Sequence, residues 1–274
     1  MTIDTADKWL SVARQRLQII KTGALVGASA PGLLASTFAL NGNPGAGTLA
    51  AGNTTSGVLF SGAISAPSAG VPPIVAFGSG NRGYLSALNF RNSITGAARL
   101  YDRIWAAGAI PQTTGTTTFS GQPSISSRVP SGTNYSGTEI LIEFVTPVSV
   151  GNGTITVGYT NQSGVSGRTT TGFVVAGSNI ATTIAEMTLQ SGDIGVQKVD
   201  SVTVSGATGT FTFNVVIARR LADFTSCIAN AKELLSWDQT EAPEVFQDSA
   251  FWLVVKIEPT TTGFPTLGLT ILNG

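Results

Sequence analysis

The sequence contains no histidine and only one cysteine. Without histidine the chain cannot form a Ser-His-Asp or Cys-His catalytic arrangement, and it offers no imidazole ligand for a metal ion. It also lacks the S-x-x-K motif of a serine–lysine pair. Cys227 has no second cysteine to pair with, and its setting in FTSCIANA fits a small buried hydrophobic residue better than a nucleophile. We therefore predict no enzymatic activity, no cofactor and no metal site.

Charge is also scarce: charged residues make up 11% of the chain, and the formal net charge is zero. Nucleic-acid-binding domains carry a basic stripe that supplies much of their affinity, so no nucleic-acid partner is expected. Residues 22–81 contain no Asp, Glu, Lys or Arg at all. Because mixed surface charge keeps ordinary domains soluble and apart, we interpret this range as a contact surface inside a larger assembly.

Long apolar runs are missing as well. Residues 24–40 are the most apolar range, but Pro31 and two glycines interrupt them. Their length lies near the lower limit of about 17–25 residues for a spanning helix. Asp4 and Asp7 stand where a secretory signal would be basic. We expect no membrane partner, and the lone cysteine suits folding in a reducing cytoplasm.

Residues 4–22 show the apolar spacing of a helix that ends at Gly23. Such a helix could lie on the chain's own core or act as a docking arm, and the charge-free range that follows slightly favours the arm. Residues 1–83 are thus interpreted as an N-terminal helix with an extended assembly arm. The apolar side chains expected to bind a partner are Trp9, Leu10, Leu17, Ile20, Leu33, Leu34, Phe38 and Phe60.

Residues 84–111 are interpreted as a helical connector, with a short helix over 93–107. Apolar residues recur there at helical spacing, and Gly108 and Pro111 would end the helix. They are Ile94, Ala97, Ala98, Tyr101, Ile104 and Trp105.

Residues 112–274 have a different character. Eight segments rich in Val, Ile, Thr and Phe are separated by turns rich in Gly, Asn or Ser, and several alternate between apolar and polar residues. Strands at this spacing indicate an antiparallel β-sandwich, jelly-roll-like in strand number. The predicted fold class is therefore mainly β, with the helices and the arm preceding the sandwich.

Two patterns suggest a ligand and are both weak. Gly78, Gly80 and Gly83 match G-x-G-x-x-G, but a dinucleotide site needs a crossover helix and a parallel strand next. Five acidic residues gather near the C-terminal end without the spacing of a calcium loop. A solvated loop is the first interpretation of this group, a patch for a basic partner the second and a calcium site the third. They are Glu233, Asp238, Glu241, Glu244 and Asp248.

Three stretches resemble a group of virion structural proteins of tailed bacteriophages: LYDRIWAAGAIP (100–111), YTNQSGVSGRTTTG (159–172) and LQSGDIGVQKVDSVTVSGATGTFTFNVVIARRL (189–221). The C-terminal FWLVVKIEPTTTGFPTLGLTILNG also fits their ending, so the resemblance covers roughly residues 84–274. It implies a virion location and no chemistry.

Within a virion two functions compete. A capsid cement or decoration protein binds the major capsid protein at the outer shell, commonly as a homotrimer, with a small β-domain and an extended arm. A tail- or fibre-associated protein, including a receptor-binding one, would show a repetitive shaft, and no fixed-period repeat occurs here. The predicted layout favours the cement protein, and a carbohydrate-cleaving tailspike is the least favoured alternative.

Overall fold

The computed structural model describes residues 13–23, 34–78, 82–150, 153–177, 179–206, 209–257 and 263–274. Antiparallel strands dominate these residues, which confirms the mainly-β prediction. Within the described ranges the only α-helix is the single turn α2 (Trp237–Thr240). Two short 3₁₀ helices, η1 (Ser126–Arg128) and η2 (Pro130–Gly132), follow one another in a connecting segment.

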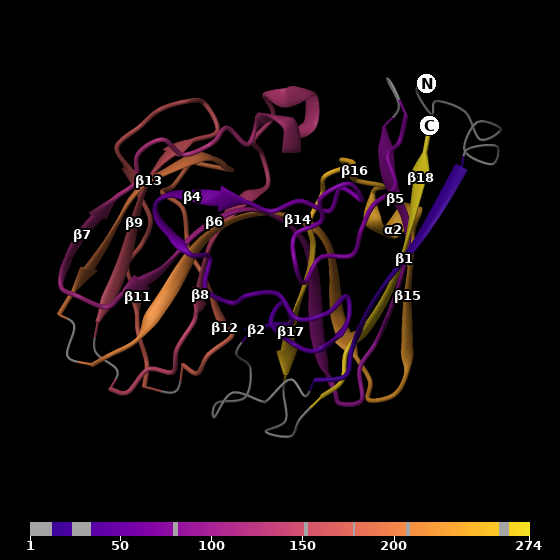
Figure 1. Ribbon diagram of the computed structural model, residues 1–274, viewed down its shortest axis with the longest axis horizontal. Helices are drawn as coiled ribbons and strands as arrows, with labels where there is room; N and C mark the ends of the chain where they lie inside the picture. Colours follow the sequence, from indigo (N-terminus) through magenta and orange to yellow (C-terminus); the bar gives the residue numbers. More distant parts are fainter. Residues whose placement is uncertain are drawn as a thin grey trace.

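Six strands in the middle of the molecule close into an antiparallel barrel (Figure 1). In order around the barrel they are β6 (Gly96–Pro111), β14 (Thr212–Cys227), β8 (Thr138–Phe144), β12 (Thr183–Glu186), β2 (Leu34–Ser36) and β17 (Phe251–Ile257). The ring closes because β17 pairs with the first half of β6. A further strand, β4 (Asn53–Leu59), pairs with the second half of β6.

A sheet lies on either side of the barrel, as Figure 1 shows. The first flanking sheet contains β15 (Lys232–Ser236), β5 (Gly83–Arg91), β18 (Thr266–Asn273), β1 (Ala13–Lys21) and β3 (Gly42–Asn43), with β16 (Glu244–Val245) beside β5. The second flanking sheet contains β10 (Arg168–Thr169), β9 (Thr154–Asn161), β13 (Val196–Ser205) and β7 (Gly115–Thr118), with β11 (Phe173–Val174) beside β9.

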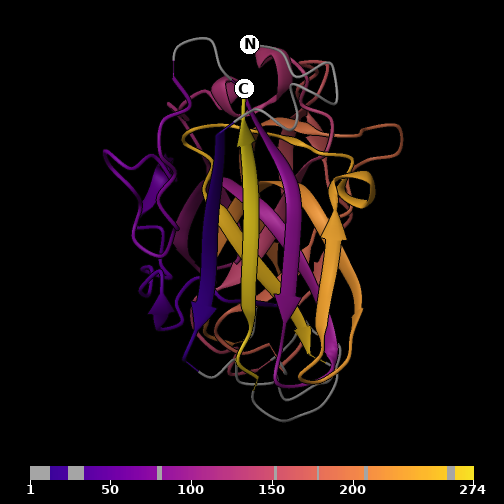
Figure 2. The same ribbon diagram turned by 90° about the vertical axis from the view of Figure 1, so that its right-hand side faces the viewer.

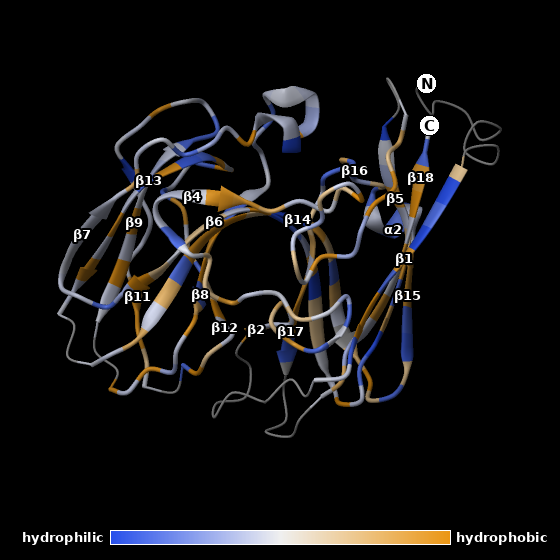
Figure 3. Cartoon of the chain, viewed as in Figure 1, coloured by the Kyte–Doolittle hydropathy of each residue, from blue (hydrophilic) through white to orange (hydrophobic). Residues whose placement is uncertain are grey.

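Three apolar clusters fill the spaces that this arrangement creates. One lies between the second flanking sheet and the barrel, one between the first flanking sheet and the barrel, and the third inside the barrel. The strands carry most of the strongly hydrophobic residues (Figure 3). The long strands β6 and β14 contribute to all three clusters, so they tie both flanking sheets to the barrel.

The predicted N-terminal helix is wrong where the structure describes it, because residues 13–21 form β1. Arg14, Arg16 and Gln18 are exposed while Leu17 and Ile19 face the core, which is the two-residue alternation of a strand. Residues 1–12 lie outside the described residues. Pairing with β18 along its whole length decides the conformation of this segment over its helical spacing.

The predicted helix over 93–107 is also wrong, since β6 occupies most of this range and continues through Gly108 to Pro111. Both faces of β6 are covered, one by the barrel interior and the other by the flanking clusters. A strand buried on both faces shows a nearly continuous apolar run instead of alternation. In such a run, residues at helical spacing are apolar too, which is why the helical pattern was misleading here.

The described part of the predicted arm, residues 34–78, packs within the chain instead of extending from it. Strand β2 sits between β12 and β17 in the barrel, and Phe38 and Phe60 belong to the cluster inside the barrel. The division into parts 1–83, 84–111 and 112–274 stays a prediction, although strands from all three ranges pair with one another.

All eight strand segments predicted after residue 112 are confirmed. They form β8, β9, β10 with β11, β12, β13, β14, β17 and β18. The predicted single sandwich becomes a barrel between two sheets, because strands from before residue 112 complete the ring and the first flanking sheet.

Candidate functional site

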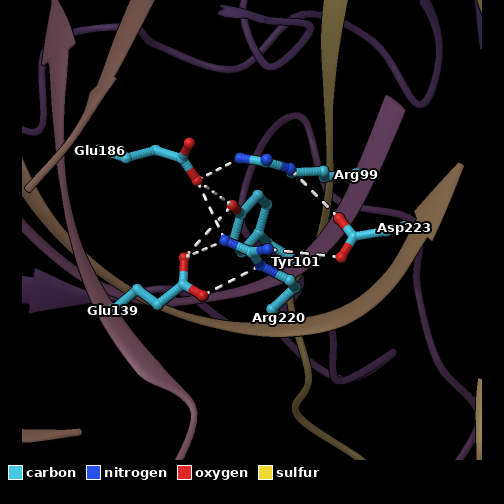
Figure 4. Close-up of polar contacts among 6 residues, drawn as sticks. All are labelled: Arg99, Tyr101, Glu139, Glu186, Arg220 and Asp223. Carbon is cyan, nitrogen blue, oxygen red and sulfur yellow. Dashed lines mark hydrogen bonds and ion pairs between the residues drawn. The ribbon is translucent and has the colours of Figure 1, made fainter. Parts of the chain in front are cut away.

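A cluster of charged side chains fills one end of the barrel (Figure 4). This barrel-end cluster consists of Arg99 and Tyr101 from β6, Glu139 from β8, Glu186 from β12, and Arg220 and Asp223 from β14. The strand register brings them together, since Arg220 lies opposite Tyr101 and Asp223 opposite Arg99.

Each carboxylate of the cluster faces an arginine. Arg220 Nε lies 2.9 Å from Glu139 Oε1, and Arg220 Nη2 lies 3.1 Å from Glu186 Oε1. Arg99 bridges Glu186 and Asp223, with Nε 3.2 Å from Asp223 Oδ1. The Tyr101 hydroxyl lies 3.3 Å from Glu139 and 3.2 Å from Glu186, so it can donate a hydrogen bond to either carboxylate.

Burial and neighbouring charge shift several pKa values in this cluster. Burial raises the pKa of Glu139, and Arg220 opposes this rise. Burial also raises the pKa of the Tyr101 hydroxyl, and the carboxylates of Glu139 and Glu186 raise it further. For Arg220, burial acts to lower the pKa, but Glu139, Tyr101 and Asp223 together outweigh burial, and the pKa is raised. Because both glutamates are held by arginines, the geometry suits a structural ion-pair network better than proton transfer.

Deeper in the barrel, Arg103 and Glu143 form a second charged pair. Arg103 Nη2 donates to Glu143 Oε2 over 2.6 Å, and both side chains are fully buried. The guanidinium carbon lies 4.6 Å from the ring centres of Phe38 and Phe60 and 4.7 Å from that of Trp252. The three rings thus enclose the cation.

A third buried charge, Asp102, faces outward from the barrel. Arg128 of η1 pairs with its carboxylate, the Ser249 hydroxyl donates to it over 2.9 Å, and the backbone N–H of Ala250 donates over 2.8 Å. Arg128 also donates to the carbonyl of Phe60. Asp102 therefore fixes η1 and the start of β17 against β6.

The predicted partner-binding residues have different fates. Phe38 and Phe60 are 2% and 7% exposed, so the expectation that a partner covers them is wrong. Both rings are buried inside the chain, where they pack against the guanidinium of Arg103. Leu17 and Leu34 are half-buried against the chain's own clusters. Ile20 is half-buried on the outer side of the first flanking sheet. Trp9, Leu10 and Leu33 lie outside the described residues.

Neither the glycine pattern nor the acidic group noted in the sequence forms a ligand site among the described residues. The residues that follow Gly83 form strands β5 and β6, so the crossover helix of a dinucleotide site is missing from this fully described stretch. The acidic residues near the C-terminal end contact different partners instead of converging. Glu244 pairs with Arg82, Glu233 accepts from Cys227 and Asp238 from Ser236. Within the described ranges, no three His, Cys, Asp or Glu side chains converge as metal ligands.

The second flanking sheet presents an uncharged hydroxyl face to solvent. Its members alternate with buried Val and Ile residues along β9 and β13, and β7 adds exposed threonines at the edge. Thr203 lies opposite both Thr116 and Thr156. The Thr116 and Thr203 hydroxyls are 2.9 Å apart. This hydroxyl face consists of Thr116, Thr118, Thr154, Thr156, Ser201, Thr203 and Ser205.

The first flanking sheet presents a different outer surface, which Figure 2 shows from the front. Its exposed charged side chains are all basic, and we call it the basic face. They are Arg14, Arg16, Arg91 and Lys232. Sequence reasoning missed this surface, although the alternation Arg14-x-Arg16-x-Gln18 was a signal for a strand with one polar side.

Across the described residues, no helix is long and apolar enough to cross a membrane. A scan against protein-family models finds no match, and a search of the curated proteins finds no relative.

Among solved structures, the chain is similar to the VP2 subviral particle of infectious bursal disease virus. The identity is 8% over 96% of this chain and 81% of that chain, with a TM-score of 0.20. The Gt strain of this virus matches at 9% identity over 98% and 82% of the two chains, with a TM-score of 0.19. T=1 particles derived from the virus match at 8% identity over 95% and 77%, also with a TM-score of 0.19. TM-scores this low carry no argument about function.

Proposed function

We propose that this chain is a non-enzymatic structural protein of a tailed-phage virion, made in the bacterial host cytoplasm. The support for a virion role is the resemblance of residues 84–274 to such proteins. Its three stretches form most of β6, the end of β9 with β10, and β13 with most of β14. Among these, β6 and β14 are neighbours in the barrel.

Within the virion we propose a cement or decoration role, in which the subunit binds the major capsid protein and stabilises the head. The single observation that carries this proposal is the distribution of charge in the folded chain. Seven of the described basic residues pair with carboxylates of the same chain, and the outer sheet surfaces are left with hydroxyl, amide and basic groups. Flat surfaces of this kind suit contact with other subunits better than binding of a small molecule.

The contacts in this proposal come from the surface of the folded body, since the described part of the expected arm is internal to the chain. A homotrimer is part of the proposal, and the uncharged hydroxyl face is the surface best suited to contact between copies, because no like charges oppose one another there.

Antibody labelling of virions that carry this protein tests the proposal. We expect label on the heads, and heads that lack the protein should release their DNA at a lower temperature than complete heads. Label confined to tails would support the tail or fibre alternative. A protein that is absent from purified virions would contradict the proposal altogether.

A further inference from the structure

The basic face of the first flanking sheet holds charge that the rest of the chain does not neutralise. Among the described residues, five exposed bases have no carboxylate partner: Arg14, Arg16, Arg91, Lys232 and Lys256. The first four of these lie on this one face. This concentration leaves the face positive.

The strand register places the four bases as two pairs. Arg91 of β5 lies directly opposite Lys232 of β15. Arg14 and Arg16 are two residues apart on β1 and point to the same side. Thr266 of β18 lies opposite Ile20 of β1 on one side and opposite Arg91 of β5 on the other. Arg16 is four residues from Ile20, so it lies about 13 Å along the strands and, two strands away, about 10 Å across them from Arg91.

Both pairs put like charges close together, which is unfavourable within the isolated subunit. No acidic residue of β1, β18, β5 or β15 points to this side. Two carboxylates lie at the margins of the sheet. Asp238 accepts from Ser236 at the end of β15, and Glu244 of β16, opposite Tyr84 at one corner, pairs with Arg82 over 3.4 Å. The remaining exposed or half-exposed positions are uncharged, including Gln18, Asn89, Thr270 and Leu234. Anionic groups from outside would therefore relieve repulsion and desolvate little else.

We propose that the basic face is a docking surface for a carboxylate-rich protein surface, with acidic side chains placed to meet both pairs of bases. The identification of this surface with a capsid partner rests on the proposed function, but the chemistry of the face does not. Leu234, which is 61% exposed, lies two residues from Lys232 on β15 and adds an apolar contact beside that pair of bases.

Two other occupants fit the face less well. Tight binding of duplex DNA draws on about six to ten phosphate contacts, whereas this face offers four bases in two separated pairs. Among the described residues, a second copy of the chain offers too few matching acids. The described exposed acids without a basic partner are Asp238 in α2 and Glu241 directly after it.

Titration of the purified full chain with poly-L-glutamate tests this inference. The face variants are Arg14→Gln/Arg16→Gln and Arg91→Gln/Lys232→Gln. The matched control is Lys198→Gln/Lys256→Gln, which removes the same charge from exposed lysines elsewhere. We expect each face variant to bind about tenfold more weakly and the control to bind like the original chain. Binding should be lost near about 1 M salt, where the screening length falls to about 3 Å.

Three results would overturn the inference. Equal losses of affinity for poly-L-glutamate in the face and control variants would show that binding responds to net charge alone. If a 20-base-pair DNA bound more weakly to the face variants while poly-L-glutamate bound equally to all variants, the face would be assigned to nucleic acid. Self-association in sedimentation runs that only the face variants abolish would assign it to a second copy. Circular dichroism and melting temperature confirm that each variant is folded. Because the titration needs no virion, its result is independent of where labelling places the protein.

Discussion

Arg103 and Glu143 form an ion pair that is completely enclosed by the barrel, at 2.6 Å between Nη2 and Oε2. The Asn214 side chain also donates to the same Glu143 oxygen over 2.9 Å, and the rings of Phe38, Phe60 and Trp252 surround the cation. The positive and negative charges thus depend on one another, because neither has water to solvate it.

Removal of one partner of this pair should destabilise the protein strongly. Glu143→Gln leaves Arg103 charged and uncompensated, so we expect the free energy of unfolding to fall by about 3–5 kcal/mol. Urea denaturation followed by fluorescence measures the change. The double variant Arg103→Met/Glu143→Gln removes both charges and should recover much of the loss. A single variant within about 1 kcal/mol of the original chain would contradict this account of the barrel interior.

Gly57 should tolerate no side chain, because it lies against the buried ring of Trp105. A Cβ at this position would come within 2.3 Å of the indole, and the backbone φ is +68°. Trp105 is fixed by a 3.0 Å hydrogen bond to the carbonyl of Ser56. We expect Gly57→Ala to cost about 1–3 kcal/mol for overpacking, added to about 1–2 kcal/mol for the left-handed backbone.

Gly52 provides the matched control for this substitution. Its φ is +79°, but a Cβ there would have no neighbour within 4 Å. Gly52→Ala therefore reports the backbone cost alone, and thermal melting of both variants separates the two effects. Equal losses in the two variants would mean that the contact with Trp105 is unimportant.

Cys227 should react very slowly in the folded protein. Burial raises the pKa of its thiol, and Glu233, which accepts the thiol hydrogen bond at 2.9 Å, raises it further. Because the thiolate is the reactive form, we expect alkylation by iodoacetamide at pH 8 to be at least about a hundredfold slower than in urea. Mass spectrometry of timed samples measures the rates. Similar rates in the folded and unfolded protein would contradict the described position of Cys227.

Lys21 should make stability rise with pH on the alkaline side of neutrality. Its side chain is buried, and Nζ donates to the carbonyls of Leu40 and Pro44 at 3.0 and 3.1 Å. Burial lowers the pKa of Lys21 to about 8 from 10.5. Between these values the unfolded chain keeps a proton that the folded chain has released, so the free energy of unfolding increases with pH.

The variant Lys21→Met isolates this effect from other groups that titrate in the same window. The stability of the original chain minus that of the variant should be constant below about pH 7 and should increase between about pH 8 and 10.5. Urea denaturation at a series of pH values gives this difference. A difference that decreases with pH would have the wrong sign for a buried lysine.

The sequence predicted best those strands that have one wet face. Along β13, Val202 and Val204 alternate with Thr203 and Ser205, so the pattern itself identifies the strand. Strand β6 has no wet face over most of its length, and its apolar residues therefore fit a helix as well as a strand. Over residues 4–22 the helical spacing of Leu10, Leu17 and Ile20 favoured a helix. The alternation within residues 13–21 favoured a strand, and pairing with β18 decides for the strand there.

The charged clusters could not have been predicted from local pattern. Glu139, Glu186 and Arg220 meet because β12, β8 and β14 are neighbours in a ring, and their positions in the sequence say nothing about that order. Likewise, the basic face joins residues of β1, β5 and β15, which are remote in sequence. Only Arg14 and Arg16 carried a local signal.

The pairing of β1 with β18, where Ala13 lies opposite Asn273, and the position of β2 between β12 and β17 have a consequence for synthesis on the ribosome. Before these later strands emerge, β1 has only the two-residue strand β3 beside it, and β2 has neither of its neighbours in the barrel. Completion of the ring and of the first flanking sheet must therefore wait until β17 and β18 have emerged, and products that stop before them would expose unpaired strand edges that promote aggregation.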